Sequence, residues 1–376
     1  MNYKFFLIGI TAFIGVAISC YATEKEKYGD TDTNNKELRI SKSIKPAFDY
    51  WMRDTWVTLG PDEYYYMTGT TADPNRRFVG QTHCWDWNDG LYLWRSKDMK
   101  KWESMGLIWS MEKDGTWQKN PKVFRKDEKY TKESLNGDPL DNKFHAVWAP
   151  EIHYIKSVKN WFIVACMNNS EGGRGSFVLR STTGKPEGPY VNIEGNKSKA
   201  LFPNIDGSLF EDTDGIVYFV GHNHYISKMK PDMSDIAENF VKIEEISYDP
   251  EPYIEGAFIL KYEGKYHLVQ AIWAHKTQEG DTYVEKKGVT NQNTRYSYDC
   301  VIATADNVYG PYSKRYTAII GGGHNNLFLD KNGNWWATIF FNPRGAQAAE
   351  YKVNCRPGLM PMLYANGKFK PKHNNE

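Results

Sequence analysis

Five segments of the chain repeat one plan, in which a polar or charged residue opens a short β-rich run that ends in a turn before a second aromatic strand. A unit that recurs at roughly 50 to 100 residues is typical of a propeller, because one blade alone cannot bury its two apolar faces. We therefore predict an all-β, five-bladed β-propeller. The innermost strands would place their opening residues around one axis. These residues are Asp54, Glu151, Asp206, Glu255 and His324.

The composition and the turn pattern support this fold and narrow the ligands. Gly-Pro and Asp-Gly turns separate β-branched and aromatic runs, and no long helical periodicity is present, so we expect antiparallel sheets. The 47 Lys and Arg residues nearly balance the 46 Asp and Glu residues, which leaves a formal net charge of +1. Such a chain has no strong field for nucleic acid or an anionic membrane. We expect small neutral ligands, no nucleic acid partner and a monomer.

The N-terminal segment has the pattern of an export signal. Lys4 precedes the apolar run FFLIGITAFIGVAI, which is too short to span a bilayer, and Ser19-Cys20 follows. A small residue directly before a cysteine resembles the bacterial lipobox, so Cys20 is the predicted lipidation site of residues 1–20. A lipidated protein would sit on the outer membrane, on its periplasmic or cell-surface side, whereas cleavage near Ala22 would leave it periplasmic or secreted. The polar residues 21–45 predict a flexible tether, and 46–376 a single propeller domain.

The remaining cysteines match no disulfide framework or zinc motif, so we predict free or buried thiols at Cys84, Cys166, Cys300 and Cys355. The highly charged segment 122–144 predicts a surface loop between the first two blades.

Carboxylates that converge on one axis suggest a specific chemistry. A single Asp or Glu beside a strand is usually a solvated turn residue, but a shared place in the repeat implies that these groups meet. Two carboxyl groups that flank an acetal are the minimal apparatus of glycoside hydrolysis. One protonates the leaving oxygen and the other activates water.

Five motifs in the same order carry a resemblance to a known family. They are Arg53-Asp54 before an aromatic strand, WAPEIH at 148–153, IDGSLFEDTDG at 205–215, YIEGAF at 253–258 and GHNNLFLDKNGNWW at 323–336. From about Trp51 to Gly367 the chain resembles glycoside hydrolase family 43, the five-bladed propeller enzymes that act on arabinosyl and xylosyl linkages.

The resemblance implies a role for each axial residue. Asp54 would be the general base and Glu255 the general acid, while Asp206 would be the pKa modulator that orients the acid. His324 would contact a central calcium ion or its waters. The chain departs from the family pattern at Thr55, Gly207 and Ala257, each in place of a proline, and Glu151 replaces the usual Asp. These departures indicate a divergent member with its own substrate specificity.

Several side chains near the motifs are candidates for sugar contact, because aromatic faces stack on sugars and a guanidinium can grip hydroxyls or a uronate. The substrate-binding candidates are Glu151, Trp148, Trp273, Trp56 and Arg344, with Trp85, Trp87, His83, His153 and His222 as further ones.

The sequence thus predicts an exported, inverting glycosidase that acts on plant or algal oligosaccharide or polysaccharide, of the α-L-arabinofuranosidase or β-xylosidase type. A neoagarooligosaccharide hydrolase is an alternative, since that propeller family is related. A glycan-binding propeller lipoprotein without turnover is another, although a binding module needs no acid–base pair of carboxyl groups.

Overall fold

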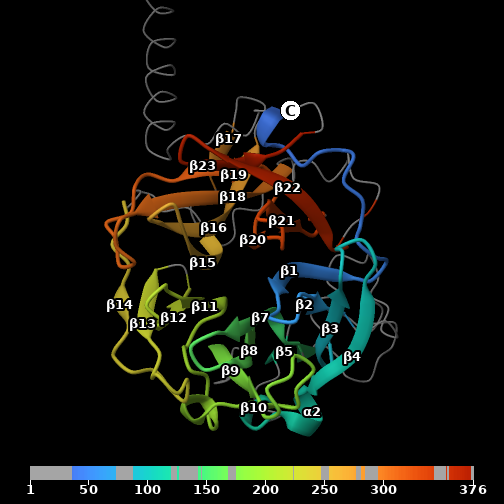
Figure 1. Cartoon of the computed structure of the whole chain (residues 1–376), viewed down its shortest axis with the longest axis vertical. Coiled ribbons are helices and arrows are strands. Elements are labelled where there is room, and N and C mark those ends of the chain that lie inside the picture. The colour runs from blue at the N-terminus through green and yellow to red at the C-terminus, as the bar shows by residue number, and fades with distance from the viewer. Residues whose placement is uncertain are drawn as a thin grey trace, which may run out of the picture.

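The computed structural model describes residues 36–72, 88–119, 125–126, 143–144, 146–167, 175–222, 224–246, 254–276, 281–283, 295–342, 353 and 355–373 of the 376-residue chain. Five antiparallel sheets surround a common axis, in chain order from the blue first blade to the red last one (Figure 1). The prediction of an all-β, five-bladed propeller is confirmed.

Each blade runs from its innermost strand outward in sequence order. The first two blades consist of β1 (Met52–Leu59), β2 (Tyr65–Thr71), β3 (Gly90–Ser96) and β4 (Glu103–Ser110), then β7 (Trp148–Ile155), β8 (Asn160–Met167), β9 (Gly175–Ser181) and β10 (Tyr190–Asn192). The third consists of β11 (Gly207–Glu211), β12 (Val217–Gly221), β13 (Tyr225–Lys228) and β14 (Val241–Lys242). The last two consist of β15 (Ile254–Tyr262), β16 (Lys265–Lys276), β18 (Arg295–Ala305) and β19 (Tyr316–Ile319), then β20 (Leu327–Leu329), β21 (Trp335–Ile339), β22 (Gly358–Ala365) and β23 (Lys368–Pro371).

The other elements are short. They are η1 (Lys36–Leu38), α2 (Met111–Asp114), η3 (Trp117–Lys119), η5 (Glu194–Asn196), the paired β5 (Arg125–Lys126) and β6 (Lys143–Phe144), and β17 (Asp281–Tyr283), which pairs with β16. The β5–β6 pair falls in the charged segment between the first two blades. Within the described ranges, no helix has the length and apolar character needed to cross a membrane.

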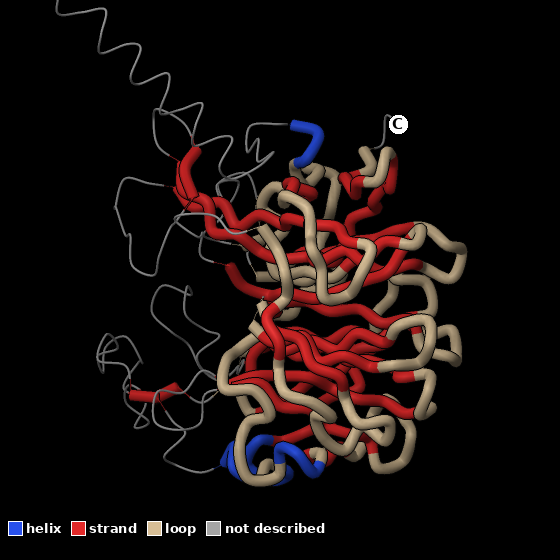
Figure 2. Tube along the Cα trace, turned by 90° about the vertical axis from the view of Figure 1, so that its left-hand side faces the viewer, coloured by secondary structure: helices blue, strands red, loops and turns tan. Residues whose placement is uncertain are grey.

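Strand β8 shows why the blades need one another. All eight of its residues are buried. Successive strand side chains point to opposite faces, so Trp161, Ile163 and Ala165 pack in the core shared with blade 1, while Phe162 and Val164 pack in the core shared with blade 3. Both faces are apolar, and only a neighbour on each side can bury them. The side view in Figure 2 shows the strands of neighbouring blades running next to one another across the molecule.

The ring closes between the last blade and the first. The Asn326 side chain bonds to the backbone of Val57 in both directions, at 3.1 and 2.8 Å. The Thr338 hydroxyl donates to the Thr55 carbonyl at 2.5 Å. These bonds fix the inner strand that carries Asp54 against the blade that carries His324.

The predicted tether ends earlier than expected. Arg39 pairs with Ile320 in a parallel bridge, and Ile40 is only 5% exposed. Residues 36–45 therefore pack on the propeller, because two isoleucines, Ile40 and Ile44, interrupt the polar composition from which a tether was predicted. Residues 1–35, including Cys20, lie outside the described part of the chain.

Cys166, Cys300 and Cys355 are buried free thiols, as predicted, while Cys84 lies outside the described residues.

Candidate active site

Every inner strand places one residue with a left-handed backbone at the axis. The φ angles there lie between 45° and 60°, a region that Asp and His adopt more readily than most residues. The five residues are Asp54, Ala149, Asp206, Gly256 and His324. Bulges in β1, β7 and β15 accompany them, since pairing is interrupted between Arg53 and Trp56 and at the matching points of the other two strands.

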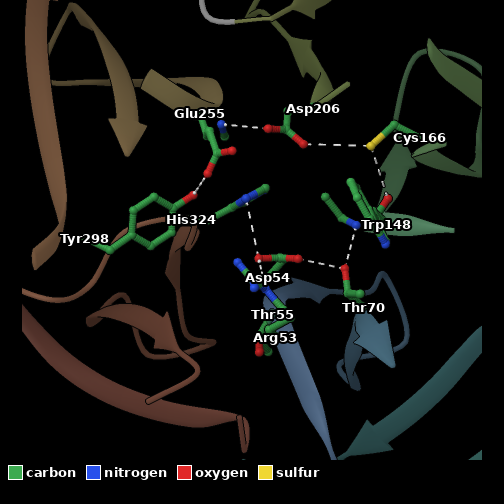
Figure 3. A network of polar contacts seen from close by, with 12 residues as sticks. Arg53, Asp54, Thr55, Thr70, Trp148, Cys166, Asp206, Glu255, Tyr298 and His324 are labelled. Carbon is green, nitrogen blue, oxygen red and sulfur yellow. Dashed lines mark hydrogen bonds and ion pairs between the residues drawn. The ribbon is translucent and has the colours of Figure 1, made fainter. Parts of the chain in front are cut away.

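The predicted axial residues therefore do not hold equivalent positions. Asp54, Asp206 and His324 occupy the left-handed position, but Glu255 precedes it by one residue and Glu151 follows it by two. The bulges change the register by a residue, which a pattern of letters does not reveal. Asp54, Asp206, Glu255 and His324, hereafter the axial site, lie together in Figure 3. Glu151 instead contacts Ser208 and His153.

Trp56, on the same inner strand as Asp54, is enclosed by other rings. The indole of Trp56 meets Phe258 edge-on, with ring centroids 5.2 Å apart, and its other neighbour is His153 at 5.0 Å. The Trp56 Nε1 donates to Thr58 at 3.1 Å, and the residue is 8% exposed. Trp56 thus packs in the core, rather than offering the open ring that was predicted for substrate contact.

Asp54 is held by donors on both carboxylate oxygens. Arg53 Nε donates to Oδ1 at 3.2 Å, and the Thr70 hydroxyl donates to Oδ2 at 2.7 Å. His324 Nδ1 lies 3.5 Å from Oδ1. Burial opposes ionisation, but the charges of Arg53 and His324 and the bond from Thr70 outweigh it and hold the pKa of Asp54 below its ordinary value. An ionised carboxylate here can act as a base.

Asp206 has the opposite tendency. Burial raises its pKa, and the negative charge of Asp54 adds to this, while the charge of His324 opposes it. The backbone N–H of Gly256 donates to Oδ2 at 3.2 Å, which ties Asp206 to the residue after Glu255. The Cys166 thiol lies 3.7 Å from Oδ1. The carboxyl group is thus placed between blades 2 and 4.

Glu255 accepts a hydrogen bond from the Tyr298 hydroxyl through Oε2, at 2.8 Å. Its neighbour Gly256 is required by space as well as by conformation, because a Cβ at that position would stand 2.8 Å from the His324 ring. The absence of a side chain at Gly256 lets His324 approach the strand that carries Glu255.

Glu151 is a further buried carboxyl group. Ser208 donates to its Oε2 at 2.6 Å, and His153 Nε2 lies 2.9 Å from the same oxygen. Burial raises the pKa of Glu151 well above its ordinary value of 4.5, although Ser208 and the charge of His324 oppose it. Burial also lowers the pKa of His153 to about 3, so this ring is neutral.

His324, the predicted contact of a central calcium ion or its waters, is paired with Asp54. Its Nδ1 faces Asp54, and burial, which favours the neutral ring, is outweighed by the three axial carboxylates, which raise the pKa of His324. Across the described ranges, no group of three or more His, Cys, Asp or Glu side chains is arranged to hold a metal ion. Contact with a hydrated ion through water stays a prediction.

The other predicted contact residues are spread more widely. Trp148 is half-buried and opens β7 beside the axial site (Figure 3). Trp273 pairs with Tyr298 across β16 and β18, two residues beyond the partner of Glu255. His222 lies in the turn after β12. Arg344, His83, Trp85 and Trp87 lie outside the described residues.

Sequence reasoning missed three donors that hold the carboxyl groups, namely Thr70, Cys166 and Tyr298. Thr70 and Cys166 stand opposite Arg53 and Trp148 on the second strand of their blades. Strand pairing from the known motifs could have found these two. Tyr298 comes from the third strand, across Ala271, and no local signal points to it.

An antiparallel five-bladed propeller with buried axial carboxyl groups, whose pKa values are shifted in opposite directions, defines the class of glycosidase-like propellers. The family model of glycosyl hydrolases family 43 matches residues 45–369, and the chain belongs to this family.

Individual relatives are distant. A β-D-galactofuranosidase of Aspergillus niger is 26% identical over 262 residues, which cover 64% of this chain and 66% of that protein, slightly under two thirds. An endo-arabinase structure from Bacteroides thetaiotaomicron has a TM-score of 0.55 and 17% identity, over 86% of this chain and 98% of that one. An endo-1,4-β-xylanase structure from the same organism has a TM-score of 0.53 and 21% identity, over 88% and 97%. The two structures are similar in fold.

Proposed function

We propose that this protein hydrolyses glycosides of five-membered-ring sugars with inversion, using Asp54 as general base, Glu255 as general acid and Asp206 as the group that orients the acid. The observation that carries the proposal is the opposed electrostatics of one small site. Arg53 and His324 keep Asp54 ionised, whereas burial favours the neutral form of Asp206 beside it.

The chemistry follows from these protonation states. The ionised Asp54 takes a proton from a water molecule as that water attacks the anomeric carbon, and Glu255 gives a proton to the departing oxygen. Asp206 holds the backbone N–H of Gly256 and so fixes the peptide that follows Glu255. Direct attack by water gives a product of inverted configuration.

The choice of sugar rests on the galactofuranosidase relative and on the resemblance to arabinofuranosidases. A β-D-galactofuranoside and an α-L-arabinofuranoside share their ring configuration and differ by one hydroxymethyl group, so one site can be built for either. A β-xyloside is the six-membered alternative within the family. Trp148, Trp273, Arg344 and Glu151 are the proposed substrate contacts or their supports.

We also propose that the protein is exported and anchored through a lipidated Cys20. The motif at Ser19-Cys20 supports this, and its test is independent of catalysis. Cys20→Ala should abolish incorporation of labelled palmitate, and retention of the label would contradict the anchor.

The test of the proposed function begins with the 4-nitrophenyl glycosides of the three sugars. On the sugar that is cleaved, Glu255→Gln should lower kcat/KM by about 100- to 10,000-fold for a phenyl leaving group, and far less for 4-nitrophenyl, which departs without protonation. NMR of the first product formed should show inversion at the anomeric carbon.

Glu211→Gln is the matched control. Glu211 caps the turn after β7, where its carboxylate accepts the backbone N–H groups of Lys156 and Ser157 at 2.8 and 2.7 Å. Glu211→Gln should leave kcat/KM unchanged for both substrates. Equal losses on the two substrates in Glu255→Gln would remove Glu255 from the acid role.

A further inference from the structure

Each proposed catalytic carboxyl group has a donor from a strand farther out in a blade. The Thr70 hydroxyl serves Asp54, the Cys166 thiol faces Asp206, and the Tyr298 hydroxyl serves Glu255 (Figure 3). Thr70 also accepts the backbone N–H of Ala149 at 2.7 Å, so it has a structural duty in the ring. Tyr298 acts on the carboxyl group from which a proton must leave, and its position therefore bears on the reaction itself.

We propose that Tyr298 is a positioning residue for catalysis, which fixes the Glu255 carboxyl group so that its proton is carried on Oε1, toward the leaving oxygen. The inference rests on the proposed role of Glu255 as general acid.

The geometry of blade 4 brings the two groups together. Ala271 of β16 pairs with Glu255 on one side and with Cys300 on the other, and Tyr298 lies two residues before Cys300. Residues directly opposite one another in a sheet share a face. The small side chain of Ala271 therefore leaves room for a phenol from the third strand to reach over it to Glu255.

The ring of Tyr298 has little freedom to move. The residue is fully buried, and its ring meets that of Phe340 edge-on at 6.4 Å. Its carbonyl accepts the backbone N–H of Gly323 at 2.8 Å, next to His324. Burial raises the pKa of the Tyr298 hydroxyl well above its ordinary value, and Glu255 adds to this, so the phenol keeps its proton and stays a donor.

The bond determines which oxygen of Glu255 can serve as acid. A carboxylic acid has one proton, and an oxygen that accepts from a phenol is the poorer place for it. With Oε2 engaged by Tyr298, the proton belongs on Oε1. Without this bond the phenol no longer distinguishes the two oxygens, and the proton is carried on Oε2 in part of the population. This penalty applies only to leaving groups that need the proton.

The experiment compares Tyr298→Phe with wild type on the phenyl and 4-nitrophenyl glycosides of the sugar that the substrate panel identifies. We expect kcat/KM to fall about 10-fold for the phenyl glycoside, in line with the net contribution of one hydrogen bond, and by less than about threefold for the 4-nitrophenyl glycoside. Added to Glu255→Gln, the Tyr298→Phe change should cost nothing more on either substrate, because no proton remains to be placed.

Tyr312→Phe is the matched control. Tyr312 lies in the same blade, is 1% exposed and donates to the Val308 carbonyl at 3.1 Å. The Tyr312→Phe variant also loses one buried hydroxyl oxygen, but away from the axis, and its kcat/KM should be unchanged for both substrates. A second variant, Ala271→Val, retains the phenol but crowds its path and should show the same leaving-group dependence as Tyr298→Phe.

The outcomes separate the two ideas. If Glu255→Gln lowers kcat/KM equally for both substrates, the acid assignment fails, and the inference fails with it. The loss of kcat/KM in Glu255→Gln can depend on the leaving group while Tyr298→Phe changes kcat/KM no more than Tyr312→Phe does. In that case the inference alone is overturned. Full additivity of the two changes would overturn it as well.

Discussion

The axial end of the inner strands and their opposite end hold aspartates with similar electrostatics. Asp54 and Asp212 are each 8% exposed. Asp212 bonds to Lys261 at 2.7 Å and to the Tyr266 hydroxyl at 2.5 Å. In both aspartates burial opposes ionisation, yet nearby cations and donors lower the pKa below its ordinary value.

The surroundings of the two aspartates differ. Asp212 faces one lysine in a closed pair, whereas Asp54 shares its histidine with two further acids, Asp206 and Glu255. Asp54 also has a left-handed backbone, at φ 51°. A lowered pKa therefore does not by itself mark a catalytic group. A catalytic group is instead marked by several acidic groups that crowd around a strained backbone, because this arrangement does not stabilise the fold by itself.

The largest expected effect separates these two aspartates. Asp54→Asn should lower kcat by about 100- to 10,000-fold on every aryl glycoside that is cleaved, because no base activates the water. Asp212→Asn should keep wild-type kcat and lose only thermal stability. Rescue of Asp54→Asn by azide, with a glycosyl azide of inverted configuration, would support the assignment. Near-normal turnover of Asp54→Asn would contradict it.

Two glycines distinguish the effect of backbone strain from the effect of steric crowding. Gly256 and Gly264 both have positive φ, 59° and 76°, but only Gly256 has a neighbour that an added Cβ would strike. Both alanine variants should therefore melt at a lower temperature. Only Gly256→Ala should also lose about 10-fold or more in kcat/KM, since it displaces His324. Equal activities of the two variants would show that the placement of His324 is unimportant.

A smaller effect distinguishes two buried glutamates by the sign of their pH dependence. Burial raises the pKa of Glu151, so folding retains a proton that the unfolded chain releases, and stability falls as pH rises above about 4.5. Glu151→Gln should therefore raise the melting temperature at pH 7 by about 1–3 °C, and the gain should vanish at lower pH.

Glu245 provides the opposite case. Burial raises its pKa, but His224 and Arg315 outweigh burial and lower it. Glu245→Gln should therefore lose stability at pH 7, and the loss should shrink on acidification. Calorimetry of both variants from pH 4 to 8 checks the signs. A stability loss at pH 7 in Glu151→Gln would mean that Glu151 is ionised in the folded protein.

The smallest expected effect is that of chelation. His324 pairs with Asp54, so EDTA should change the melting temperature and the activity of the wild type little. A clear fall in both, absent from His324→Ala, would instead reveal the hydrated calcium ion that the family resemblance implies.

The sequence alone determined the fold and the identity of the central acids. Turn residues between β-branched and aromatic runs, together with five repeated openings, predict strands that bury both faces. Short motifs carry Asp54, Asp206 and Glu255, and each of these is a left-handed residue or precedes one. These are local properties of a few consecutive residues, so a linear pattern preserves them.

The position of Glu151, the packing of Trp56 and the hydrogen-bond partner of Glu255 depend on tertiary contacts. The bulge in β7 leaves Glu151 two residues after the left-handed position, and two isoleucines pack part of the expected tether on the propeller. Trp56 became packing because Phe258, from a blade three further along the chain, meets its ring. Tyr298 lies on the third strand of its blade and reaches Glu255, 43 residues away in the chain, over the second strand. Such contacts depend on how strands stack around an axis, and no spacing along the chain encodes that distance.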